Sequence, residues 1–177
     1  MARFVRYLAL ALAVVPLDAS RAQVGPTRPH TATRVDARQL GGTWKLLTVD
    51  NILADGRRIQ PYGAEPVGRM TLDPAGRYAV QIFQPGRARF AASDKARGTA
   101  EENRATVQGT NSHFGRYAVD EAARTITFRI EHASFPNWEG TEQRRVYTLR
   151  GDTLRYTVRT TTTGGSEVGE VTWLREP

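Results

Sequence analysis

Two histidines, His113 and His132, have the clearest potential for acid–base chemistry in this 177-residue sequence. If Glu121–Arg124 is a four-residue hairpin loop, Asp120 pairs with Thr125 and the two histidines lie opposite each other. Facing inward together, they would form a general acid–base pair or half of a metal site. A register shift of one residue would turn one histidine outward, and two histidines without a third ligand seldom bind zinc. The alternative is that both are polar residues near the rim of the fold.

The face that this pairing predicts to be interior also carries a set of apolar and aromatic residues, namely Tyr117, Val119, Ile126, Phe128 and Ile130. Tyr117 adds a phenol that could take part in proton transfer. We assign no catalytic residue, and His113, His132 and Tyr117 are the candidates if a reaction is catalysed.

Arg144 and Arg145 are adjacent on the next predicted strand, so only one of the two guanidinium groups can face inward. Arg144 is the inward one if Val146 is inward, and Arg145 if Tyr147 is. A buried arginine is costly unless it is paired, so the inward one is a candidate clamp for a ligand carboxylate.

The loop at 135–140 has the sequence Phe-Pro-Asn-Trp-Glu-Gly. Its aromatic residues, Phe135 and Trp138, would suit an apolar ligand if they lie beside the mouth of a pocket. The alternative is that they plug one end of the fold.

Several common classes of site are excluded by the sequence. Because the chain has no cysteine, disulfides, thiolate metal sites and cysteine nucleophiles are absent. No Gly-x-Ser-x-Gly, Walker, Rossmann or His-Glu-x-x-His pattern occurs. We therefore expect no metal and no cofactor, and enzymatic activity is not the leading interpretation.

The formal net charge is +7, and all but two of the 25 basic residues are arginine. Such a charge can indicate an anionic partner such as nucleic acid or a phospholipid surface. The arginines are scattered along the predicted strands, however, and no basic run with interleaved aromatic residues occurs. We expect no nucleic-acid partner.

Residues 1–22 have the pattern of a signal peptide. Arg3 and Arg6 form a positive start, the following apolar stretch is too short to span a membrane, and Ser20-Arg21-Ala22 predicts cleavage after Ala22. Residues 23–39 are polar and contain prolines, which predicts a flexible tether. The folded domain is expected at 40–176, in a periplasmic or secreted protein.

Alternating apolar and polar residues predict short strands separated by turns. The expected strands are 43–49, 67–72, 78–82, 114–120, 125–132, 143–150, 153–160 and 167–175. The prolines in 59–66 exclude a central strand there and predict a packed loop. About eight strands with hairpin connections favour an antiparallel up-and-down barrel or a sandwich over a parallel α/β fold.

The segment 85–112 interrupts the strand pattern. Thr99 and Glu102 have the spacing of a capping box, and helix-forming residues follow as far as Gln108 before Gly109. We expect one short helix inside a long connection, which is either a lid over a pocket or a surface loop.

The ordered motifs of the folded region resemble those of the bacterial and fungal lipocalin-like domain family. The matching pieces are Leu-Gly-Gly-Thr-Trp-Lys-Leu at 40–46, Pro61-Tyr62-Gly63, Asp73-x-x-Gly76-Arg77-Tyr78, Phe114-Gly115-x-Tyr117, Phe135-Pro136-Asn137-Trp138, Gly151-Asp152-x-Leu154 and Trp173-x-Arg175. The chain departs from plain lipocalins because it has no cysteine pair and because it carries the long segment 85–112.

This resemblance implies a small antiparallel barrel with an interior pocket, and it implies no single activity. It also implies that Trp44 packs at the closed end of the barrel beneath Arg175 of the last strand. A cation–π contact of this kind contributes ~0.5–2 kcal/mol, and it would latch the first strand to the last.

We therefore expect an exported monomeric barrel, without a stable membrane anchor, that binds a small apolar or amphipathic ligand in its lumen. The residues expected to contact the ligand are His113, Tyr117, Phe128, Ile130, His132, Phe135, Trp138, Arg144 and Tyr147. The alternatives are a pocket-type isomerase or cyclase of a biosynthetic pathway, a haem-binding barrel with one histidine deep in the lumen, and an interaction module with a closed core.

Overall fold

The computed structural model describes residues 37–163, 165–166 and 168–177. The signal peptide expected at 1–22 and the tether as far as residue 36 lie outside these residues. The strands are β1 (Gly42–Ile52), β2 (Arg58–Ile59), β3 (Val67–Leu72), β4 (Arg77–Phe83), β5 (Thr110–Asp120), β6 (Thr125–Ala133), β7 (Glu142–Arg150), β8 (Thr153–Arg159) and β9 (Val168–Arg175). The helices are α1 (Ala37–Leu40) and α2 (Ala100–Gln108), with 3₁₀ turns η1 (Lys95–Arg97) and η2 (Pro136–Trp138).

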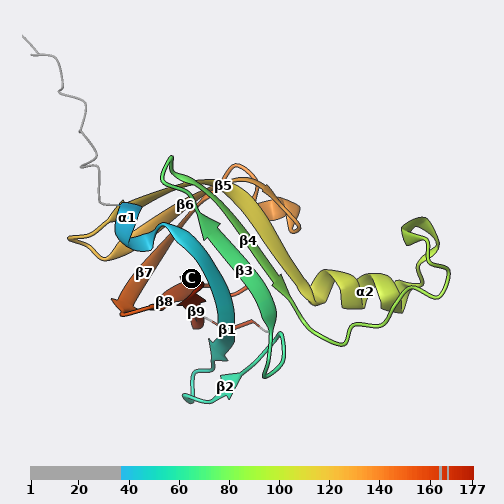
Figure 1. The fold of residues 1–177 in the computed structure, drawn as a ribbon. Coiled ribbons are helices and arrows are strands. Elements are labelled where there is room, and N and C mark those ends of the chain that lie inside the picture. The colour runs from blue at the N-terminus through green and yellow to red at the C-terminus, as the bar shows by residue number, and fades with distance from the viewer. Residues whose placement is uncertain (1–36, 164, 167) are drawn as a thin grey trace, which may run out of the picture. The chain divides into compact units, whose positions relative to one another are not determined.

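The strands form a closed antiparallel barrel (Figure 1). β1 pairs with β3 on one side and with β9 on the other, so eight strands follow one another around the barrel in chain order. The short β2 pairs with the end of β1 at Asn51 and Ile52. The prediction of an all-β, up-and-down barrel of eight strands is confirmed.

A strand occurs at the start of the segment 59–66, where a packed loop was predicted, and β5 begins at Thr110, inside the predicted connection 85–112. Ile59 belongs to β2, because the first proline of the segment, Pro61, comes only after the two residues that pair with β1. The rest of the segment is irregular, as its prolines predict, and Tyr62 within it is buried. The packed loop therefore begins at residue 60.

One end of the barrel, which we call the closed end, carries α1 and the turns 73–76, 121–124 and 151–152. The indole of Trp44 is completely buried there, and its Nε1 donates a hydrogen bond to the Leu40 carbonyl at 3.0 Å. The guanidinium carbon of Arg175 lies 4.2 Å from the Trp44 ring centroid, and its Nη1 donates to the Gly41 carbonyl at 2.7 Å. The two residues predicted as a latch are thus in contact, on the paired strands β1 and β9.

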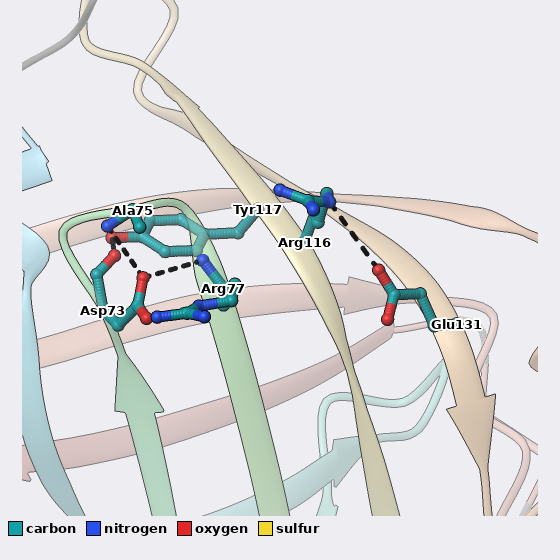
Figure 2. A network of polar contacts seen from close by, with 6 residues as sticks. All are labelled: Asp73, Ala75, Arg77, Arg116, Tyr117 and Glu131. Carbon is teal, nitrogen blue, oxygen red and sulfur yellow. Dashed lines mark hydrogen bonds and ion pairs between the residues drawn. The ribbon is translucent and has the colours of Figure 1, made fainter.

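The turn between β3 and β4 is fixed by its own aspartate (Figure 2). Asp73 Oδ1 accepts hydrogen bonds from the backbone N–H groups of Ala75 (2.7 Å) and Arg77 (3.1 Å), and Oδ2 lies 2.7 Å from Arg77 Nε. The hydroxyl of Tyr117 on β5 donates to the Asp73 carbonyl at 2.9 Å. Tyr117 is therefore part of the closed end.

A bulge in β6 sets which side chains of β5 and β6 face the lumen. Gly115 pairs with Ile130 and Phe114 pairs with His132, so Glu131 is an extra residue on β6. His113 consequently pairs with Ala133 and is buried, whereas His132 lies on the outer surface. The expectation that the two histidines face each other is wrong, because the bulge shifts the register by one residue.

The connection 84–109 contains the expected helix. Thr99 is the N-cap of α2, its side chain and that of Glu102 form a complete capping box, and Gly109 is the C-cap. Figure 1 shows α2 leading into β5 away from the wall of the barrel. No helix in the described ranges has both the length and the apolar character needed to cross a membrane.

Candidate functional site

The barrel contains a cavity of about 290 Å³ between its core and the end opposite the closed end. We call this end the open end; it carries β2, the loop 59–66, η2 and residues 160–163. Six apolar residues from five strands form much of the wall, namely Val49, Val80, Ile82, Phe128, Val158 and Val171. The cavity therefore provides an apolar surface for a ligand.

His113 presents a neutral polar group to this cavity. Its Nδ1 lies 2.9 Å from the hydroxyl of Tyr78, and the aromatic rings of Phe128 and Trp138 flank it. Burial, followed by the repulsion from Arg145, lowers the pKa of His113 to about 4. At neutral pH the imidazole is uncharged and can both donate and accept a hydrogen bond.

Arg145 presents a cation to the same cavity. On β7 the buried Tyr147 faces inward and Val146 is 52 % exposed, so Arg145 is the inward arginine and Arg144 lies on the exposed face near the mouth. Burial lowers the pKa of Arg145, while Tyr156 and Tyr78 act in the opposite direction. A guanidinium remains protonated under such shifts.

The two tyrosines near Arg145 stay in the phenol form. Burial raises the pKa of Tyr78 and also that of Tyr156. Tyr156 lines the cavity, and Tyr78 packs against Phe128 with tilted rings and reaches His113. The polar cluster Tyr78–His113–Arg145–Tyr156 thus carries one positive charge and several hydrogen-bonding groups next to an apolar wall.

The open end is surrounded by polar and aromatic residues. Trp138 of η2 lines the cavity and packs edge-on against Phe135, which is exposed. Asn51, the last inward residue of β1, donates a hydrogen bond to the Thr163 carbonyl and ties this strand to the segment 160–163. Within the described residues, the cavity wall includes none of 84–110, so α2 does not cover it.

The comparison with known families agrees with this geometry. Residues 41–176 match the family described as the lipocalin-like domain. This chain is a member of the lipocalin-like domain family. It is also similar to the 4'-hydroxy-3'-methoxypropiophenone carrier protein ppsC of Aspergillus oryzae, with 30% identity over 107 residues that cover 56% of this chain and 96% of the fungal protein.

The lipocalin-like barrel brings some of the predicted ligand contacts together and separates others. His113, Phe128, Trp138 and Arg144 line the cavity. The others lie elsewhere: Tyr117 and Tyr147 are buried at the closed end, Ile130 is buried without lining the cavity, Phe135 lines a neighbouring hollow, and His132 is exposed beside Glu139. The binding roles of the four lining residues remain predictions.

Other lining residues of this lipocalin-like barrel were not predicted. Tyr156 and Val158 follow the buried Leu154 at alternate positions of β8, and this alternation in the sequence would have identified them. Asn51 is different. A second bulge, between Leu46 and Thr48, shifts which residues of β1 face inward, so the alternation at the start of the strand does not extend to Asn51. Nothing in the local sequence pattern indicates that bulge.

Proposed function

We propose that this chain is an exported carrier that binds a small, largely apolar molecule in the lumen of its lipocalin-like barrel. The observation that carries the proposal is the cavity of about 290 Å³ with its apolar wall and few polar groups. Ligand pockets commonly occupy roughly 300–1,000 Å³, so this one suits a small molecule with one to three rings. An interaction module with a closed core would not contain such a space.

The fungal relative supports the same class of function, because its name describes a carrier of a small aromatic ketone. A compound of that size, with one ring and a short chain, is compatible with the cavity volume of this chain. We therefore propose small aromatic compounds as the first ligands to test.

Filling the lumen is expected to abolish binding of an apolar probe. Val158 faces the cavity from β8, so Val158→Trp places an indole where the ligand would lie. With the neutral fluorescent probe N-phenyl-1-naphthylamine, we expect the dissociation constant to rise by about tenfold or more, which corresponds to ~1.4 kcal/mol or more of lost binding free energy. Fluorescence titration measures it.

The matched control for this experiment is Val146→Trp, which adds the same side chain on the outer face of β7, where Val146 is 52 % exposed. This variant should bind the probe as the wild type does. Equal binding by both variants would place the probe outside the lumen, and absence of binding by the wild type would contradict the proposed function.

The export part of the proposal is supported by the sequence of residues 1–22. A chain expressed in a bacterium with its own leader is expected in the periplasmic or secreted fraction, with Gln23 as its first residue. Intact-mass measurement of the recovered protein checks this, and a full-length chain found only in the cytosol would contradict it.

A further inference from the structure

The cavity holds a cation that has no carboxylate partner among the residues that the structure describes. The Arg145 guanidinium is largely buried in the lumen, and none of the ion pairs formed by the described residues includes it. Its one hydrogen bond in that part of the chain is donated by Nη2 to Gln143 Oε1. A guanidinium has five N–H donors, so most of its hydrogen-bonding capacity remains available to a ligand.

The carboxylates that line the same cavity are engaged elsewhere. Glu142 Oε1 lies 2.6 Å from Arg129 Nε, and Glu170 Oε2 lies 2.6 Å from Arg58 Nη1. Both contacts hold the carboxylates toward arginines other than Arg145.

The remaining titratable groups near Arg145 carry no negative charge at neutral pH. His113 is neutral, and Tyr78 and Tyr156 are phenols whose raised pKa keeps them protonated. These groups can orient a ligand by hydrogen bonds, but they cannot neutralise the guanidinium. The described residues of the lumen thus leave the charge of Arg145 uncompensated.

A buried charge is costly unless it is paired. Charge-assisted hydrogen bonds to a guanidinium are strong, and a carboxylate can accept two of them side by side. The Arg145 side chain is held by Gln143 at the inward face of β7, next to the apolar wall formed in part by Phe128 and Val158. A ligand with an acidic end and an apolar body would pair with the guanidinium and pack against the apolar wall.

We propose that the cavity selects small aromatic molecules that carry one acidic oxygen group, a carboxylate or a phenolate, which pairs with Arg145. This inference rests on the proposed function and specifies its ligand class. The buried Asn111 Oδ1 in the same cavity has no hydrogen-bond partner among the described residues, and it is available to accept a bond from a ligand hydroxyl.

The test compares acids with neutral molecules of nearly the same shape by direct calorimetric titration. One pair is 3-phenylpropanoate and 3-phenylpropanamide. The other is 4-hydroxyacetophenone and 4-methoxyacetophenone, titrated above and below the pKa of the phenol. For the wild type we expect at least one acid to bind roughly 10–100 times more tightly than its neutral partner, the range that a charge-assisted hydrogen bond supports. The pair that shows the preference identifies the acid as carboxylate or phenolate.

Arg145→Met should remove this preference and retain binding of N-phenyl-1-naphthylamine, because methionine keeps an apolar wall. Arg145→Lys should retain part of the preference, since it keeps the charge and loses the planar donor set. The matched control is Arg155→Met, which removes an exposed arginine from β8 and should bind all the compounds as the wild type does.

A wild type that binds the neutral probe and shows no preference for either acid would overturn the acid-binding inference and leave the proposed function intact. A preference that persists in Arg145→Met would also overturn it. A wild type that binds neither the probe nor the acids would overturn the proposed function as well.

Discussion

Replacing Gly115 with alanine is expected to lower the free energy of unfolding by about 3 kcal/mol, at the upper end of the usual cost of overpacking. A Cβ atom at this position would lie 2.1 Å from the Arg129 carbonyl oxygen and 2.8 Å from the Glu131 nitrogen. Both are backbone atoms of the bulge in β6, so the clash cannot be relieved by a change of rotamer. Urea denaturation followed by circular dichroism measures the effect.

Gly140→Ala is the control for the loss of a glycine without a clash. Gly140 has φ +73°, and a Cβ atom there would meet no other atom within 4 Å. Its replacement should cost about 1 kcal/mol through backbone strain alone. If Gly115→Ala lowers the free energy of unfolding by no more than Gly140→Ala does, β5 and β6 do not approach each other at the bulge as closely as the structure shows.

The second large effect is a loss of stability in acid that comes from His113. Its pKa is about 4 in the folded protein, below the ordinary value of 6.5. Between these two values the unfolded chain binds a proton that the folded chain does not bind. Stability should therefore fall as the pH drops from about 6.5 to about 4, and the full contribution of this one group is about 3 kcal/mol.

His113→Asn removes this contribution, whereas the carboxylates that titrate in the same range are the same in both proteins. The difference in unfolding free energy between wild type and variant should therefore change by about 3 kcal/mol between pH 7 and pH 4, in favour of the variant in acid. Urea denaturation at a series of pH values gives this difference. A difference that does not vary with pH, or an NMR titration of the ring centred near 6.5, would contradict the burial of His113.

The sequence predicted the architecture well, because local patterns specify it. The turn Asp73-Pro74-Ala75-Gly76 lies between β3 and β4, where its aspartate caps the turn, and the capping box of Thr99 and Glu102 begins α2. The alternation of apolar and polar residues predicted a strand at 67–72, and β3 has these same bounds. These features depend on residues close together in the chain, which a single sequence displays directly.

The candidate site was predicted less completely, because it depends on register between strands. One extra residue in β6 separates His113 from His132, and an isolated glycine at 115 was the only local indication of it. The choice between Arg144 and Arg145 depended on which face of β7 packs inward, and both faces carry apolar residues. Such choices are made by packing across the whole barrel.

The pairing of β1 with β9 has a consequence for how the chain folds. Residues from Trp44 to Ile52 of the first strand pair with β9, so they acquire this neighbour only when the last strand is available. A barrel closed by contacts so distant in sequence has a high contact order, and domains of this kind fold on the order of milliseconds to seconds rather than microseconds. The barrel, and with it a closed lumen, therefore cannot form before the last strand has been synthesised.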